Sequence, residues 1–428
     1  MSDPHPIRLE VSDDLRRSRL TVLFRLLLAL PVLIWVTLWT FAVVVAVLFG
    51  WVAALVRGRL PTGLHEFFAS YVRCVTQLGS YLAIAANPYP GFTGRPGYPV
   101  DVAISEPRPQ ARWKIAFRLP LVVPALLLAA ALGSGLAGGG AGGARGGPDV
   151  QWFSSSGVGG VAAVCAVLGW FASLATARAP RGLRNLATYG LGYTAQTYAF
   201  ALLLTDRYPN ADPDALGPAW KLPPHPVVLE VADDGRRSRL TVAFRALLAL
   251  PHLVWLTLWG VAAVLAAIAN AVVVLLGGRS AAALHRFLAA YVRYSAHVTA
   301  FLFLVANPFP GFVGAPGYPV EVAIAERARQ SRWVTFFRAV LALPAFLLSL
   351  ALSGALLVLS FLGWFAALVL GRMPTGLRNL GAVCVRYLAQ TNAYWLIVTD
   401  RYPHASPALR PPPAADQLEL DLDLEAAA

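Results

Sequence analysis

The sequence contains little charge. Only 13% of its 428 residues are charged, against roughly 25% in an average soluble domain. Hydrophobic residues make up 57% of the chain, and the mean hydropathy is +0.60. A chain of this composition has too little polar surface to cover a large core in water. The composition therefore indicates an integral membrane protein, with several segments longer than the ~18 apolar residues that mark a membrane span.

Patterns that carry chemistry are absent as well. The sequence has no Walker A loop, no HExxH, no GxSxG and no CxxC pair, and its seven histidines are scattered. The three cysteines, Cys74, Cys165 and Cys384, lie in apolar segments without metal-binding spacing. No carboxylate lies in the middle of an apolar segment, where proton-driven carriers usually need one. We therefore expect no enzyme activity, no cofactor and no metal site.

The formal net charge is +13, and arginine supplies nearly all of the basic residues. These arginines cluster beside apolar segments, where anionic lipid headgroups would meet them. No nucleic-acid-binding motif accompanies them. We expect membrane lipids as partners, with anionic headgroups on the cytoplasmic face, and no nucleic acid. The sequence identifies no protein partner.

The chain is built from a fourfold repeat. Each copy begins with a short segment in which apolar and polar residues alternate, followed by a basic patch and a Phe-Arg pair. An apolar stretch with proline comes next, and then a helix with several polar residues that ends near Tyr-Pro or Phe-Pro. The arginines of the Phe-Arg pairs are Arg25, Arg118, Arg245 and Arg338. The copies span residues 5–92 (copy A), 98–210 (copy B), 225–312 (copy C) and 318–405 (copy D).

Copies A and C resemble each other most, and copies B and D share a Thr-Asp-Arg-Tyr-Pro ending. This alternation predicts two tandem membrane domains. The domains are residues 1–211 and 227–405, joined by a Pro-rich linker at 212–226. Copy B carries a Gly-rich insertion at 133–160, and residues 411–428 form an acidic tail that we expect to be disordered.

The predicted fold is an all-α polytopic membrane protein of four pseudo-repeats. Each copy is expected to hold a short cytoplasmic strand, an apolar interfacial or kinked helix and a two-pass helical hairpin. The long apolar segment of copy A has ~31 residues, and a straight helix of that length measures ~46 Å against a membrane core of ~30 Å. Tilt, a kink at proline or an interfacial piece would resolve the mismatch. This gives about eight spans, with twelve membrane elements as the alternative.

The alternating openings predict strands near Ile7–Val11, Val100–Ile104, Val227–Val231 and Val320–Ile324. We expect these strands to meet on the cytoplasmic face. The termini and inter-copy linkers carry more lysine and arginine than the four hairpin turns. The positive-inside rule then predicts a multi-pass protein of the cell membrane with both termini in the cytoplasm.

A polar column runs through the second helix of each copy. Arg73, Arg293 and Arg386 occupy one aligned position, where copy B has Gly192. Four residues later come Gln77, Gln196, His297 and Gln390. An i, i+4 spacing puts both positions on one helix face. Because a lipid-facing arginine at mid-span costs ~2.5–3.5 kcal/mol, we expect the column to point into protein. It lines a polar path or headgroup site, or it joins helices by binding backbone carbonyl groups.

The string FR-x-LLALP-x-L, followed by GR-x-PTGLRNL, a mid-helix arginine and TDRYP, resembles a known family. It is similar to the bacterial membrane-protein family catalogued as domain of unknown function (DUF) 4389, as two tandem family domains. The resemblance implies a membrane location and no established activity.

The sequence leaves three function classes open. The first is a non-enzymatic scaffold or envelope-associated membrane protein. The second is a transporter or channel with an Arg/Gln-lined path between the repeats. The third, a membrane enzyme acting on lipid, lacks a candidate nucleophile constellation.

Overall fold

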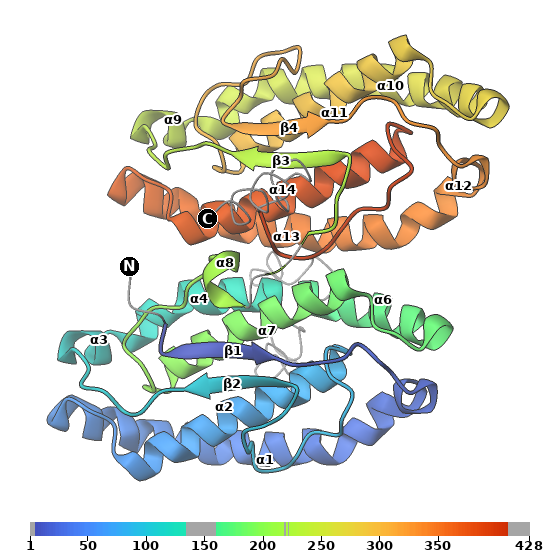
Figure 1. Ribbon diagram of the computed structural model, residues 1–428. Coiled ribbons are helices and arrows are strands. Elements are labelled where there is room, and N and C mark those ends of the chain that lie inside the picture. Colours follow the sequence, from blue (N-terminus) through green and yellow to red (C-terminus); the bar gives the residue numbers. More distant parts are fainter. Residues whose placement is uncertain (1–4, 134–159, 218–219, 221, 410–428) are drawn as a thin grey trace, which may run out of the picture.

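The computed structural model describes residues 5–133, 160–217, 220 and 222–409. Nearly all of the predicted Gly-rich insertion and the whole of the predicted acidic tail lie outside these residues. The described chain is mostly helical, with four helical hairpins lying side by side and two short ribbons of strands (Figure 1).

The four openings form strands with the predicted bounds: β1 (Ile7–Val11), β2 (Val100–Ile104), β3 (Val227–Val231) and β4 (Val320–Ile324). In β1, Ile7 and Leu9 are buried while Arg8 and Glu10 are exposed, as the alternation predicts. The strands do not form one sheet. They form two antiparallel two-stranded ribbons, β1–β2 and β3–β4.

Long apolar helices follow the strands: α1 (Arg19–Arg57), α10 (Arg245–Gly277) and α13 (Arg338–Leu370). All three are long and apolar enough to cross a membrane. Short helices precede three of the four Phe-Arg pairs: α3 (Arg112–Ala116), α9 (Arg239–Ala243) and α12 (Arg332–Phe336).

The long segment of copy A is one continuous helix, without the separate interfacial element that the sequence allowed. Pro31 lies inside α1. Proline removes one backbone hydrogen bond, but residues on either side of it, Ala29 and Val32, are buried in a cluster with Leu78 and Tyr81. This packing keeps the helix continuous. Copies C and D have the same arrangement, with a proline inside each of their long helices.

Copy B divides its long helix into α4 (Arg118–Leu132) and α6 (Val161–Thr176). Both pieces pack on the second helix of the same copy. The backbone of Gly160 lies against the carbonyl oxygen of Gly133. The two ends of the insertion therefore meet, and the helix pieces on either side keep the place of one long helix.

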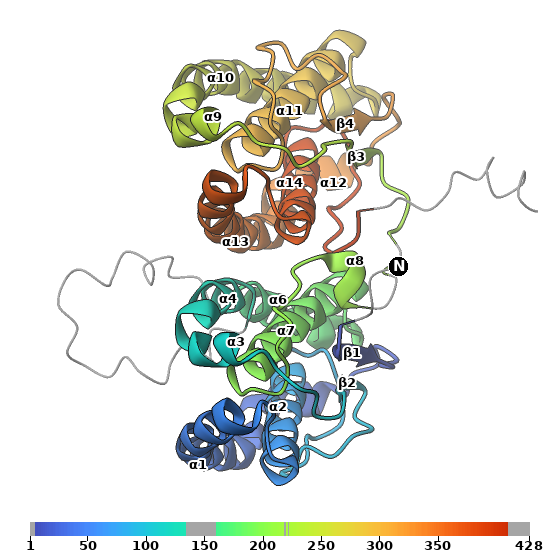
Figure 2. The ribbon, with the colours of Figure 1, turned by 90° about the vertical axis from the view of Figure 1, so that its left-hand side faces the viewer.

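The second helices are shorter and less apolar: α2 (Thr62–Leu82), α7 (Arg181–Ala201), α11 (Ala282–Leu302) and α14 (Thr375–Trp395). Figure 2 shows the resulting three layers. We call α1, α4 with α6, α13 and α10 the outer layer, and α2, α7, α14 and α11 the inner layer. The two ribbons lie on the far side of the inner layer, which is therefore covered on both faces (Figure 2).

A pseudo-two-fold axis relates the two copies within each half. Leu9 of β1 lies opposite Val102 of β2, and these residues occupy equivalent positions in copies A and B. Leu229 and Val322 repeat this relationship in the second half. The strands are also exchanged, because β1 packs on α7 of copy B while β2 packs on α2 of copy A.

The exchange places the hairpin turns at opposite ends of the molecule. The backbone N–H of Gln110, just before copy B begins its helices, donates to Gly58 O in the turn of copy A at 2.8 Å. The backbone N–H of Arg17, just before α1, donates to Ala177 O in the turn of copy B at 3.0 Å. The hairpin turns thus do not gather at one end of the molecule, as the charge count had assumed, because β2 runs back along the molecule before the helices of copy B start.

Each long helix also receives side-chain contacts from the other copy of its half. One arginine from each copy donates to a carbonyl group in the last turn of the neighbouring long helix: Arg19 to Ala175, Arg112 to Val56, Arg239 to Val369 and Arg332 to Leu276. A cation at a helix C-terminus also interacts favourably with the helix dipole. These reciprocal contacts join the ends of antiparallel long helices.

Candidate functional site

The arginines of the polar column face the ribbons and adjoining loops. The half-buried Arg73 donates from Nε to Val102 O at 3.2 Å. Arg293 makes the equivalent bond to Val322 O at 3.2 Å and lies 3.1 Å from the carboxylate of Glu321. Arg386 is buried, and its Nη2 donates to the carbonyl oxygens of His404 and Ser406. The column arginines thus bind strand or loop backbone.

The second position of the column is buried in every copy. Gln196 donates to Ile7 O at 2.9 Å, and its Oε1 accepts the backbone N–H of Asn210 at 2.9 Å. Gln390 repeats both bonds with Val227 O and the backbone N–H of His404. These two glutamines hold the first residue of β1 and β3 and the loop after their own helices.

Copies A and C fill this position differently. Gln77 donates to Arg95 O at 2.8 Å and contacts Asp101 at 3.4 Å. His297 stacks on Tyr318 with ring centroids 4.6 Å apart. The structure therefore gathers the column into two groups, one under each ribbon, rather than into one central set.

Gly192 has a structural reason for standing where the other copies have arginine. A Cβ atom at this position would lie 2.6 Å from Leu216 Cδ2 and 3.3 Å from Leu9 Cδ2. Leu216 ends α8 (Pro213–Leu216), a short helix in the Pro-rich linker that is capped by Asp212. The linker packs on α7, and Leu216 fills the space into which a side chain at this position would extend.

The arginines of the Phe-Arg pairs form the most regular polar feature of the molecule. All four are at most 3% exposed. Each guanidinium lies over an aromatic ring of the second helix, 4.1–4.7 Å from the ring centroid, on Tyr81, Phe200, Phe301 and Tyr394. Each also donates to carbonyl groups where the second helix ends, as Arg245 does to Phe301 O at 2.6 Å and Ala306 O at 2.9 Å. We call these four residues the clamp arginines.

Each second helix is followed by a residue in the left-handed backbone conformation, which lies beside a clamp arginine. Ile84, Leu203, Leu304 and Ile397 have φ values of 57° to 64°. A β-branched residue rarely adopts this conformation, so Ile84 and Ile397 must be held there by their surroundings. Their carbonyl oxygens accept bonds from equivalent side chains: Arg17, Gln110, Arg237 and Gln330. Two donors per copy thus fix the C-terminus of each inner-layer helix.

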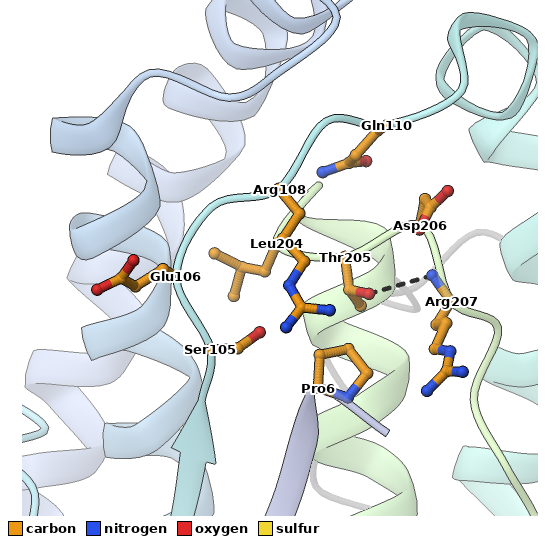
Figure 3. A pocket seen from close by; sticks show the side chains of 9 residues that line it. All are labelled: Pro6, Ser105, Glu106, Arg108, Gln110, Leu204, Thr205, Asp206 and Arg207. Carbon is orange, nitrogen blue, oxygen red and sulfur yellow. Dashed lines mark hydrogen bonds between the residues drawn. The ribbon is translucent and has the colours of Figure 1, made fainter. Parts of the chain in front are cut away.

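A polar hollow lies at the equivalent place in each half. It lies between the start of the first strand of the ribbon and the Thr-Asp-Arg turn that follows the second helix of copy B or D. Its volume is about 90 Å³ in the first half and about 350 Å³ in the second. Figure 3 shows Arg108 pointing into the first hollow, between Ser105 and Thr205. The second half has Ala328 at the position of Arg108, which leaves its hollow wider. Within the described residues, no group of three or more His, Cys, Asp or Glu side chains could hold a metal ion.

His404 lies in the loop that the column of copy D holds. Burial lowers the pKa of this imidazole, and together with the neighbouring Arg386 and His225 it brings the pKa to about 4. Its Nδ1 accepts the backbone N–H of Ser406 at 3.3 Å. At neutral pH His404 is therefore an uncharged acceptor within a hydrogen-bonded loop.

Sequence reasoning identified the clamp arginines only as markers of the repeat. Their recurrence directly before an apolar stretch was the available signal, because a charge kept there in all four copies has to be neutralised by buried partners. Three tryptophans at equivalent places in the long helices, Trp51, Trp170 and Trp364, also join neighbouring copies. They donate to the carbonyl oxygens of Ile115 in α3, Val22 in α1 and Val242 in α9.

The chain belongs to the family described as Domain of unknown function (DUF4389). The family matches residues 19–93, 150–211, 239–313 and 332–406. This confirms the resemblance seen in the sequence. Each match falls on a single copy, so one helical hairpin is the repeated unit of the family. No curated protein and no solved structure matches the chain.

Proposed function

We propose that the protein is a non-enzymatic membrane protein that acts as a structural scaffold in the cytoplasmic membrane of a bacterium. The observation that carries this proposal is how its buried polar side chains are used. Gln196, Gln390 and Arg386 bind backbone groups of the ribbons and loops, and the clamp arginines bind helix ends. Side chains with these partners hold the molecule together and are not presented to a substrate.

The alternative is a transporter or channel in which the Arg/Gln column lines a path between the repeats. That function requires the column to face a continuous polar passage. The column is divided between the two ribbons, and its arginines and glutamines bind strand or loop backbone, while His297 stacks on Tyr318. The arrangement supports a scaffold better than it supports a carrier.

The proposed partners are membrane lipids and other proteins of the envelope. Three helices, α1, α10 and α13, are long and apolar enough to cross a membrane. Exposed arginines at the ends of the outer layer, such as Arg57 and Arg239, are placed to meet anionic headgroups. We propose that the polar side of the molecule and both termini face the cytoplasm.

The test uses purified protein reconstituted into phosphatidylethanolamine–phosphatidylglycerol liposomes. We expect no release of trapped potassium, chloride or amino acids beyond that from protein-free liposomes. Gln390→Leu should lower the unfolding temperature, because it removes two buried hydrogen bonds, while Arg8→Leu on the exposed ribbon should not. Flux that requires the wild-type protein and is lost in a fully folded Gln390→Leu variant would support the transporter.

A further inference from the structure

We infer that the protein lies flat in one leaflet of the membrane, with the outer layer among the acyl chains and the ribbons facing the cytoplasm. In this arrangement the long helices run parallel to the membrane plane and do not cross it. The inference rests on the proposed function, because it takes membrane attachment as given and specifies its geometry. The occupant assigned to the apolar face of the outer layer is the acyl-chain region of a phospholipid leaflet.

The exposed face of the outer layer is apolar over its whole length. Phe41 and Phe49 of α1 are each 69% exposed, and Leu265 of α10 is 64% exposed. Apart from the buried clamp arginines, the described outer-layer helices carry charge only at Arg19 and Arg57, the two ends of α1. Exposed apolar patches on soluble monomers rarely exceed a few hundred Å², so a face four helices wide requires a nonpolar environment.

The opposite face is polar at the middle of the molecule. Gln196 binds Ile7 O, and Gly192, one helical turn earlier, lies beside Leu9. The strand β1 therefore runs along the axis of α7 at the middle of that helix. Its outward side chains, Arg8 and Glu10, are exposed there.

This placement is incompatible with an upright inner layer. If α7 crossed the bilayer, Arg8 and Glu10 would face lipid near its centre, at ~2.5–3.5 kcal/mol for each charge. The open edges of the ribbon would also leave backbone N–H and C=O groups without partners in hydrocarbon. With the helices in the membrane plane, the whole ribbon lies in water.

Helix length leads to the same orientation. The 39 residues of α1 correspond to ~58 Å, and the 33 residues of α10 and of α13 to ~50 Å. Crossing a core of ~30 Å would require tilts of roughly 50–60°, beyond the 0–40° seen for membrane spans. A helix lying in the plane has no such limit.

The pseudo-symmetry keeps all four long helices on the same face. The axis between Leu9 and Val102 runs through the layers, so it exchanges the copies without turning the molecule over (Figure 2). Both ends of the outer layer therefore meet the same leaflet. Both ends carry exposed basic side chains, Arg57 and Arg59 at one and Arg19 and Arg178 at the other. Anionic headgroups of a single leaflet complement both.

The experiment measures from which side the two ends can be labelled. Full-length Arg59→Cys and Arg178→Cys variants place one thiol in the hairpin turn at each end, and Glu10→Cys places one on the ribbon. Inside-out and right-side-out vesicles of the cytoplasmic membrane are treated with a membrane-impermeant maleimide. The unsubstituted protein, whose Cys74, Cys165 and Cys384 are buried, gives the background. Arg279→Cys and Arg372→Cys repeat the test in the second half.

We expect all three thiols to react in inside-out vesicles, with at least tenfold less labelling in right-side-out vesicles. Reaction of Arg59→Cys and Arg178→Cys from opposite sides would overturn the inference and leave membrane attachment intact. Recovery of the unsubstituted protein in the soluble fraction after cell breakage would instead overturn the proposed membrane attachment itself. That second outcome fits two copies that cover each other's apolar faces in water.

Discussion

Gly376, near the start of α14, lies against the backbone of Asp212, where the first half of the chain passes into the linker. A Cβ atom at Gly376 would lie 2.9 Å from the backbone nitrogen of Asp212. The equivalent glycine of copy B, Gly182, faces Ala405 with 3.1 Å to its backbone nitrogen. The two halves therefore meet through the same contact made twice.

Asparagine side chains repeat this reciprocity. Asn185 Nδ2 donates to Ser406 Oγ at 2.9 Å, and the equivalent Asn379 Nδ2 donates to the carboxylate of Asp212 at 3.1 Å. A contact surface that pairs residue i with j and j with i has two-fold symmetry. The halves are thus related by a second pseudo-two-fold axis, and α13 packs beside α4 and α6 at the centre of the outer layer.

Gly376→Ala should destabilise the joint between the halves. The new methyl group would overlap the backbone of the linker, which cannot move aside as a flexible side chain can. Overpacking of this kind costs ~1–3 kcal/mol. A lower unfolding temperature in detergent, measured by intrinsic fluorescence, checks the prediction.

Gly63 supplies the matched control for Gly376. It occupies the same position in copy A, a Cβ atom there would meet nothing within 4 Å, and copy C has Ala283 at this position. Gly63→Ala should leave the unfolding temperature unchanged or raise it slightly. If Gly63→Ala and Gly376→Ala lowered the unfolding temperature equally, the loss of stability would come from the helix backbone and not from the contact between the halves.

Arg245→Leu should destabilise the protein by about 3 kcal/mol or more. The substitution removes the guanidinium donor from the carbonyl groups of Phe301 and Ala306, and it removes the cation from the ring of Phe301. Chemical unfolding monitored by circular dichroism measures the loss. Arg236→Leu is the control, because the Arg236 side chain is 89% exposed. A loss no larger than that of Arg236→Leu would contradict the role of the clamp.

Much of the local structure could be predicted from the sequence. The strands follow from period-2 alternation, and the helices follow from long apolar runs that end at Gly and Pro. The direction of each hairpin could not be predicted. The sequence predicts the strand β2 but not its partner, and the antiparallel pairing of β2 with β1 carries the chain back along the molecule before the helices of copy B begin.

The polar column was also predictable in its local geometry but not in its contacts. An i, i+4 spacing was enough to place Arg386 and Gln390 on one helix face. Their partners are backbone carbonyl groups, which every residue carries, so the sequence does not identify which ones they bind. The reason for glycine at position 192 could not be predicted either, because the side chain that lies against it, Leu216, comes from the linker.

Trp364→Phe should weaken the joint between copies C and D by ~0.5–1.5 kcal/mol. The indole Nε1 of Trp364 donates to Val242 O at 3.1 Å, in the first turns of copy C. Phenylalanine keeps most of the apolar contact and removes this bond. Trp333→Phe is the control, since Trp333 is 75% exposed. Equal unfolding temperatures for the two variants would show that the hydrogen bond of Trp364 does not stabilise the contact between copies C and D.

Lowering the pH from 7 to 4 should destabilise the protein partly through His404. The pKa of His404 is about 4 in the folded protein and near 6.5 in the unfolded chain. Between these values the unfolded chain binds more protons, so stability falls as the pH falls through this window and levels off below the folded pKa. Other groups titrate in the same range, so the contribution of His404 has to be isolated by substitution.

His404→Asn isolates it, because copy B has Asn210 at the equivalent position. The side-chain oxygen of Asn210 accepts the backbone N–H of Asp212 at 3.0 Å, as His404 Nδ1 accepts that of Ser406. The variant should keep the loop and lose one titrating group. We expect its unfolding temperature to match that of the wild type at pH 7.5 and to exceed it at pH 4.5 by a few °C. If the unfolding temperatures of the two proteins changed with pH in parallel, His404 would be protonated as easily in the folded state as in the unfolded chain.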